Sequence, residues 1–341
     1  MNRLTKIGAS ALCGTLACVS AAHAGSLGVK GSAVLTHMVN ENAMSGNPIG
    51  MNSGITFTGS GELDNGTTFV LTLTDADQSA YSSGNLVLTT AGLGVIGIDQ
   101  GAGGQGLDRI DDKMPTAWEE TNGTGLNTGI ATVAGVGGST NIEWAPSADM
   151  MPDGMSAYIA YTPRAGTSNV NDKATGGAGD NYSKSGWDFV LIHSGVTDGL
   201  EVFAGYSNIE QIVVATDRHG DRTQYAIGAT YAVGAMTLGY EYTRDNMQDG
   251  GPNAVSFYEN NLYGVSYQVN DDLTLSAGFA RSDAHKNGLA NVSNDADSFQ
   301  VSYTMGGATF VFAQTSVDNG TYTSGTSKDI DGRTVRLSLA F

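Results

Sequence analysis

Cysteine, proline and long apolar runs are all scarce in this chain of 341 residues. Both of its 2 cysteines, Cys13 and Cys18, lie within the first 24 residues. The rest of the chain therefore has no disulfide framework, no thiol nucleophile and no cysteine metal site. The 6 prolines beside 48 glycines exclude collagen and Pro-rich disorder. No stretch of about 18 consecutive apolar residues occurs, which excludes a transmembrane helix.

Basic residues are also few. The chain has 16 Lys and Arg against 34 Asp and Glu, which gives a net charge of −18 at pH 7. A strongly acidic surface repels nucleic acid and attracts cations. Nucleic acid is therefore excluded as a partner.

The first 24 residues have the features of a secretory signal. Arg3 and Lys6 supply a positive start, and a short apolar core and a small-x-small cleavage site follow. We predict that residues 1–24 are a cleaved signal peptide and that residues 25–341 form one exported domain. A retained membrane anchor and a lipid anchor at Cys18 are the alternatives.

Apolar residues at every second position are the main pattern of the mature chain. Residues 225–231 and 236–242 alternate in this way on either side of a tight turn, as in a β-hairpin with one apolar face. Similar hairpins recur, and longer polar connections such as 245–258, 283–296 and 318–329 separate them. Short turns that alternate with long loops are typical of outer-membrane barrels. The pattern predicts about 16 strands, at residues 27–39, 55–63, 67–74, 84–90, 93–98, 139–145, 155–164, 187–194, 200–211, 225–231, 236–242, 263–269, 273–279, 299–305, 308–317 and 330–341.

The last strand alternates strictly over residues 334–341 and ends on the aromatic Phe341. An ending of this kind is expected where the last strand must pair with the first to close a barrel. We therefore predict an all-β fold, a transmembrane antiparallel β-barrel. Arg336 lies between the apolar positions of this strand and so has inward parity.

One connection, residues 99–138, is far longer than the others, and loops above about 15 residues usually have a function. The G-x-G-x-x-G at 101–106 would need a parallel sheet and a following helix to bind a dinucleotide. Adjacent carboxylates do not define the two opposed acids of a hydrolase, so we predict no enzyme. Several carboxylate oxygens could hold Ca²⁺, for example at Asp111 and Asp112. The acidic residues of the connection are Asp99, Asp108, Asp111, Asp112, Glu119 and Glu120, and the basic ones are Arg109 and Lys113.

In its leader, hairpin rhythm, acidic third loop and terminal Phe341, the chain resembles the general diffusion porins of Gram-negative outer membranes. The resemblance covers residues 25–341 and implies a homotrimer of barrels of about 16 strands, each with a water-filled pore. In these porins the third loop folds into the pore, and its acidic residues face basic residues of the wall. The resemblance implies an outer-membrane location and passive diffusion of ions and small hydrophilic solutes, without catalysis or cofactor.

Carried over by position, the six acidic residues of the third loop would line the pore constriction. The inward parity of Lys30, Arg222 and Arg336 makes them candidates for the basic wall. Acidic groups outnumber basic ones in this set, so we predict a preference for cations. The resemblance also makes Phe341 the signal read by the outer-membrane assembly machinery.

Other functions remain open from the sequence. The alternatives are a substrate-selective channel for sugars or amino acids and a surface structural or adhesin protein. Of the 14 tyrosines, all but Tyr81 lie after residue 150, so the early strands lack the aromatic girdle of lipid-facing walls. We expect these early strands to meet another subunit, with Val70 and Leu73 in that contact.

Overall fold

The computed structural model describes residues 25–41, 47–76, 79–124, 126, 128–166, 183–213, 220–325 and 328–341. The predicted signal peptide and its cleavage site lie outside these residues. Within them, no helix is long and apolar enough to cross a membrane. The short 3₁₀ turns are η1 (Gly106–Arg109), η2 (Ala148–Met150) and η3 (Gly320–Tyr322).

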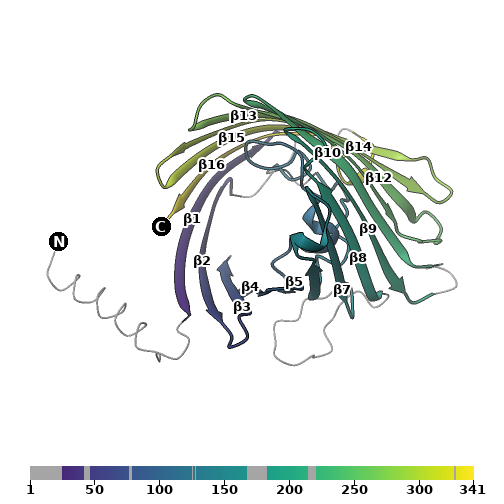
Figure 1. Cartoon of the computed structure of the whole chain (residues 1–341). Helices are drawn as coiled ribbons and strands as arrows, with labels where there is room; N and C mark the ends of the chain where they lie inside the picture. Colours follow the sequence, from purple (N-terminus) through teal and green to yellow (C-terminus); the bar gives the residue numbers. More distant parts are fainter. Residues whose placement is uncertain are drawn as a thin grey trace.

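Sixteen antiparallel strands follow one another around a closed barrel (Figure 1). Each strand is hydrogen-bonded to its sequence neighbours, and β16 pairs with β1. The predicted all-β antiparallel barrel and its strand order are confirmed. The strands are β1 Ser26–Asn40, β2 Ile49–Glu62, β3 Thr68–Ala76, β4 Ser79–Thr90, β5 Gly94–Gln100, β6 Asn141–Ala145, β7 Met155–Thr162, β8 Ser183–His193, β9 Leu200–Gln211, β10 Arg222–Val233, β11 Met236–Asn246, β12 Val255–Gln268, β13 Leu273–Lys286, β14 Val292–Met305, β15 Ala308–Asp318 and β16 Ile330–Ala340.

The closing pair of strands continues to the end of the chain. Leu337 lies opposite Leu35, and Arg336 lies opposite Thr36. Beyond the last ladder residue, Gly31 N donates to Phe341 O at 2.7 Å and Phe341 N donates to Gly31 O at 2.9 Å. The C-terminal residue is therefore part of the seam that closes the barrel.

Alternation gives each strand an apolar outer face and a polar or small inner face, because successive side chains point to opposite sides. On β11, for example, Tyr240 is exposed outside whereas Glu241 is fully buried inside. Aromatic side chains gather on the outer wall from β7 onward. The exposed ones are Tyr161, Trp187, Phe189, Tyr206, Tyr231, Tyr240, Tyr263, Tyr267, Phe279, Phe299, Tyr303 and Phe310.

The two residues expected at a subunit contact lie on different faces of β3. Leu73 lies opposite Phe57 and is on the outer face, whereas Val70 lies opposite Ser60 and is on the inner face. The expectation for Val70 was therefore wrong, because residues three apart in a strand point to opposite sides.

Several strands extend into polar stretches that the sequence pattern assigned to loops. Strand β12 begins at Val255, and β13 continues to Lys286. Cross-strand pairs of polar and charged side chains on the outer face accompany this extension. Arg244 Nη1 lies 2.9 Å from Glu259 Oε1, and His285 Nε2 lies 3.1 Å from Glu259 Oε2.

Candidate pore and its inner loop

The connection between β5 and β6, residues 101–140, packs against the inner wall of the barrel, and we call it the inner loop. In Figure 1 its trace lies within the ring of strands, toward β7 to β9. It corresponds to the predicted third loop, but begins later because Asp99 and Gln100 belong to β5.

Apolar side chains fix the underside of the inner loop to the wall. Leu107 and Ile110 are fully buried and pack in one cluster with Val190 and Phe203. Burial of such a side chain contributes about 1.5–3 kcal/mol. Glycine on the wall makes this approach possible, since a Cβ at Gly205 would lie 2.5 Å from Leu107 Cδ1.

One wall carboxylate holds the two stems of the inner loop together. Asp188 Oδ2 accepts hydrogen bonds from Leu107 N at 2.7 Å and from Val136 N at 2.9 Å, and Asp188 is fully buried. Next to each bond the loop has a glycine with positive φ, Gly106 at 60° and Gly135 at 57°. A Cβ at Gly135 would lie 2.1 Å from Asp188 Oδ2, so the stems reach this carboxylate only because these residues are glycines.

A wall amide holds the middle of the inner loop. Gln300 Oε1 accepts hydrogen bonds from Thr116 Oγ1 at 2.7 Å, Trp118 N at 3.0 Å and Glu119 N at 3.2 Å. Its Nε2 donates to Glu119 O at 2.6 Å. The loop is therefore attached to β8 at its ends and to β14 at its centre.

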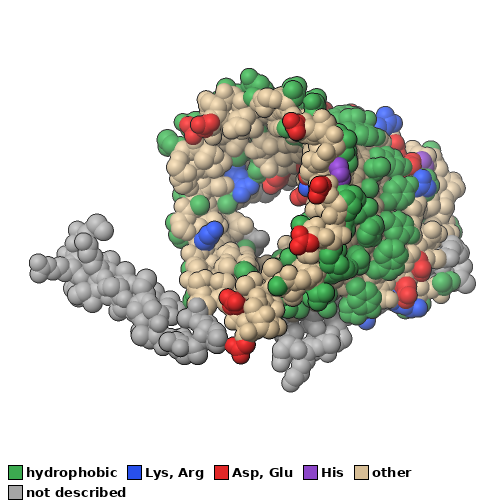
Figure 2. Space-filling view, in the orientation of Figure 1, with side chains coloured by type: hydrophobic (Ala, Val, Ile, Leu, Met, Phe, Trp, Pro, Cys, Tyr) green, Lys and Arg blue, Asp and Glu red, His purple; other side chains and the backbone are tan. Residues whose placement is uncertain are grey.

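An opening passes through the barrel beside the inner loop. Figure 2 shows red acidic side chains on its right border and blue basic side chains on its left border. The exposed part of the loop forms a polar hollow of about 510 Å³. Its charged lining residues are Asp108, Arg109, Asp111, Asp112 and Lys113.

Burial and crowding of carboxyl groups on the inner loop raise the pKa values of some of them. Burial, together with the charges of Asp108, Asp112 and Glu120, raises the pKa of Asp111 to about 8. Burial and Asp112 also raise the pKa of Glu120 to about 8, against a lowering by the hydrogen bond from Met114 N. The charges of Asp111 and Glu120 therefore appear only as the pH rises through about 8.

The predicted basic residues lie on the inner face but differ in their surroundings. Arg336 Nη1 is 3.8 Å from Glu119 Oε1, and its guanidinium is 5.6 Å from the centroid of the Trp118 ring. Arg222 is bound to the wall residue Asp245, with Nη2 2.5 Å from Oδ2. Lys30, opposite Thr56, is exposed with inward parity. The structure thus places Arg336 at the middle of the inner loop.

Asp99 differs from the other acidic residues proposed for the constriction. It is fully buried, and its carboxylate accepts hydrogen bonds from Gly101 N, Ala102 N and Gly103 N at 3.1, 2.9 and 3.4 Å. This carboxylate shapes the start of the inner loop. Gly101 and Gly103 of the G-x-G-x-x-G pattern donate to this carboxylate, and the pattern lies between antiparallel strands and not in a dinucleotide site.

Sequence reasoning missed the residues of the wall that hold the loop. Glu143 accepts hydrogen bonds from Gly106 N at 2.7 Å and from Arg109, and Asp188 and Gln300 act as described above. Glu241, fully buried, has no hydrogen-bond partner for either carboxylate oxygen among the described residues. Inward parity was the available signal for all of these residues, but it does not identify a partner across the barrel.

The described ranges contain no group of three or more His, Cys, Asp or Glu side chains that could hold a metal ion. The Ca²⁺ site at Asp111 and Asp112 therefore stays a prediction.

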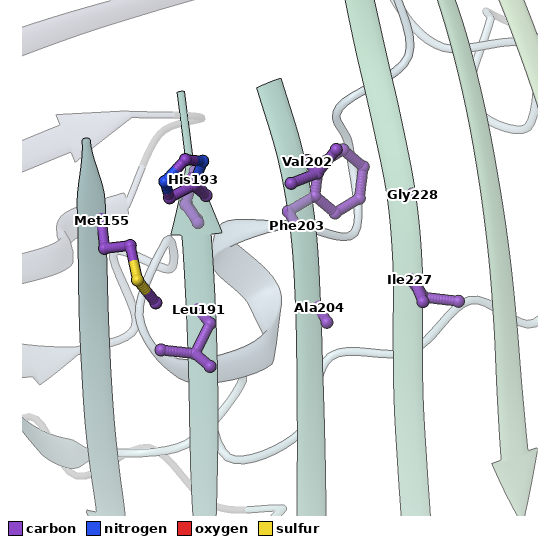
Figure 3. Close-up of a pocket in the computed structure, with 9 residues that line it drawn as sticks. Met155, Leu191, His193, Val202, Phe203, Ala204, Ile227 and Gly228 are labelled. Atoms are coloured by element: carbon purple, nitrogen blue, oxygen red, sulfur yellow. The ribbon is translucent and has the colours of Figure 1, made fainter. Parts of the chain in front are cut away.

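An apolar hollow of about 360 Å³ lies on the outer wall at β7 to β10, away from the polar lumen (Figure 3). Outward-facing side chains line most of this hollow, and the inward-facing residues Phe203 and Gly228 lie between them. Those outward side chains are Met155, Leu191, His193, Val202, Ala204 and Ile227.

A closed antiparallel barrel with an apolar outer face, a polar lumen and a loop packed inside it defines a transmembrane channel protein. The chain belongs to the Gram-negative porin family, whose model matches residues 8–336. It is therefore an outer-membrane channel and not an enzyme.

Solved porin structures share the fold at low sequence identity. The Salmonella typhi OmpF complex with daunomycin is 16% identical, with a TM-score of 0.63 over 93% of this chain and 98% of that chain. Vibrio cholerae OmpT is 13% identical, with a TM-score of 0.64 over 94% and 99%. A mutant of the Rh. blastica porin is 14% identical, with a TM-score of 0.60 over 93% and 100%. A search of curated proteins found no match.

Proposed function

We propose that the barrel is a passive channel for ions and small hydrophilic solutes and that it prefers cations. The observation that carries this proposal is that basic side chains in the lumen are paired with carboxylates. Four of them have a carboxylate partner, while Asp108, Asp111 and Asp112 line the open hollow of the inner loop. The pairs are Arg109–Glu143, Lys113–Glu201, Arg222–Asp245 and Arg336–Glu119.

Ion selection in such a channel follows the charge of its lining. The paired bases contribute little net positive field, because each partner carboxylate offsets the charge within a few ångströms. The loop acids then set the sign of the potential in the lumen. Lys30, exposed with inward parity, is a wall cation that could oppose them in our proposal.

The cation preference should increase with pH. The carboxyl groups of Asp111 and Glu120, with pKa values of about 8, are neutral in acid and ionise as the pH rises through that value. We expect the ratio of K⁺ to Cl⁻ permeability to rise about twofold between about pH 6 and about pH 9. Reversal potentials of the reconstituted protein in a KCl gradient measure this ratio.

A double variant, Asp111→Asn with Glu120→Gln, is the matched control, and it should lose most of the pH response. Anion preference of the unaltered protein, or a permeability ratio that is independent of pH, would contradict the proposal.

We also infer a homotrimer in which the outer face of the early strands meets another subunit. This face carries aliphatic side chains such as Leu35, Met51 and Leu71, whereas the exposed aromatic residues of the described ranges, apart from Phe57 on β2, lie from β7 onward. Aromatic girdles mark walls that face lipid. The aliphatic face is therefore the better candidate for contact with protein.

A charge at Leu73 should separate the subunits. Leu73→Asp would bury an unpaired carboxylate in the contact, at a cost of about 3–5 kcal/mol per subunit. Val70→Asp, three residues away, directs the same charge into the lumen and should keep the trimer. Band position on gels in mild detergent reports the outcome, and a trimer that survives Leu73→Asp would place the contact elsewhere.

A further inference from the structure

The connection between β15 and β16 sends one aromatic side chain into the barrel. Tyr322, in η3, is 6% exposed and lies beside the inner loop. We call residues 319–323 the strap. Connections β5–β6 and β15–β16 lie at the same rim, because both link an odd-numbered strand to the next in an antiparallel barrel. The strap can therefore reach the second half of the inner loop.

Hydrogen bonds join the strap to the inner loop and to the wall. The Tyr322 hydroxyl accepts from Ala131 N at 2.8 Å and lies 2.5 Å from Ser282 Oγ on β13. Thr321 N donates to Thr128 O at 3.1 Å. A single phenol thus connects loop backbone to wall.

Packing and a charged side chain complete the attachment of Tyr322. Its ring lies 5.0 Å from the Tyr258 ring, centroid to centroid, and its carbonyl accepts from Lys286 Nζ at 3.2 Å. Gly129, with φ of 68°, leaves the room that the strap needs, since a Cβ there would lie 2.6 Å from Thr321 Cγ2. The two segments are fitted to each other.

The strap holds this position with a strained backbone. Asn319, Thr321 and Tyr322 have φ values of 55°, 58° and 54°. The left-handed region is unfavourable for β-branched and bulky side chains, and such residues persist there only where surrounding contacts hold them. The contacts of Tyr322 are therefore opposed by a backbone that favours release.

We propose that Tyr322 is a positioning residue that holds the inner loop, from Thr128 to Ala131, against the wall. The proposal rests on the channel function proposed above. When Tyr322 leaves its site, the N–H of Ala131 loses its acceptor. The wall then holds this half of the inner loop through Asn260 Nδ2, which donates to Ala131 O at 2.8 Å, and Asn294 Nδ2, which donates to Thr128 O at 2.7 Å, and the loop moves into the lumen more often. The balance between phenol contacts and backbone strain sets how often the channel partly closes.

Two substitutions shift this balance in opposite directions. Tyr322→Phe keeps the ring but removes the hydroxyl that Ala131 and Ser282 share, and should make partial closures about tenfold more frequent. Thr321→Gly keeps the hydrogen bond from residue 321 N and relieves the positive φ, and should make closures several-fold rarer. Single-channel recordings in planar bilayers measure these rates.

Heat-induced unfolding of each variant barrel, followed by gel mobility, shows whether a substitution weakens the whole structure. This unfolding should change little in both variants, because Tyr322 acts on the inner loop and not on the barrel. Closure rates equal to those of the unaltered protein in both variants would overturn the role of Tyr322 while leaving the channel function intact. Closure rates that rise in both variants would also overturn it. Absence of conductance in the unaltered protein would overturn the channel function itself. Should Tyr322→Phe fail to fold, the expected decrease in Thr321→Gly still decides the matter.

Discussion

Deletion of Phe341 should prevent most chains from completing the barrel. The residue supplies both backbone hydrogen bonds to Gly31, at 2.7 and 2.9 Å. Its ring covers Gly31, where a Cβ would lie 2.2 Å from Phe341 Cε2. An aromatic ring over a strand glycine stabilises a sheet at a point where the glycine itself has no side chain to pack. With net values of about 1 kcal/mol for each hydrogen bond, we expect the folded yield to fall at least about tenfold.

Refolding into detergent, followed by heat-modifiable mobility on gels, measures this yield without any cellular machinery. Phe341→Leu keeps the two backbone bonds and loses the ring, so it should refold better than the deletion. If Phe341→Leu refolds normally in detergent but fails to assemble in cells, the aromatic ring acts as an assembly signal. Normal refolding of the deleted chain would show that the seam does not need its last residue.

Asp188→Ala should widen the pore and make its current noisy. The substitution leaves Leu107 N and Val136 N without their acceptor at a fully buried site. Each unsatisfied N–H costs about 1–3 kcal/mol, which is enough to detach the stems of the inner loop from β8. The barrel itself keeps its ladder bonds, so the protein should still fold. We expect single-channel conductance to increase by about half or more, because the loop no longer fills one side of the lumen.

Two matched variants sharpen the Asp188 experiment. Asp188→Asn retains an oxygen acceptor and should keep conductance close to that of the unaltered protein. Gln224→Ala removes the acceptor of Gly135 N alone, a bond of 2.7 Å, and should have an intermediate effect. Equal conductance in Asp188→Ala and the unaltered protein would mean that the other contacts of the loop, its apolar packing and its hydrogen bonds with Glu143 and Gln300, hold it without Asp188.

The strands could be predicted because a barrel wall imposes a period of two on the sequence. Prediction stopped short where both faces of a strand are polar. Asp283 and Asp295 lie outside on β13 and β14, near Arg281 at 3.6 and 3.9 Å, so the ladder continues where apolar alternation has ended. The error at Val70 had a simpler cause, since Val70 and Leu73 could never share a face of one strand.

The inner loop shows a different limit of prediction. Its acidic residues are clear in the sequence, because Asp111 and Asp112 stand in a long connection without strand pattern. The side chains that hold it, such as Asp188 and Gln300, come from strands far away in the sequence. Period two assigns these residues to the inner face, but the curvature of the closed barrel decides which loop atoms they meet. For the same reason Asp99, which the sequence groups with the lining acids, is a buried backbone acceptor.

The two stems of the inner loop meet on a single oxygen of Asp188, so the residues between them form a closed circuit, which Gln300 and Tyr322 also hold between its ends. Such a circuit is modular. Residues between Leu107 and Val136 can be exchanged, shortened or extended while the sixteen-strand ladder that carries the barrel stays the same. Pore width and barrel stability are then separate traits. A lineage, or a protein engineer, could change what passes through this channel by altering the circuit alone, without selecting a new wall.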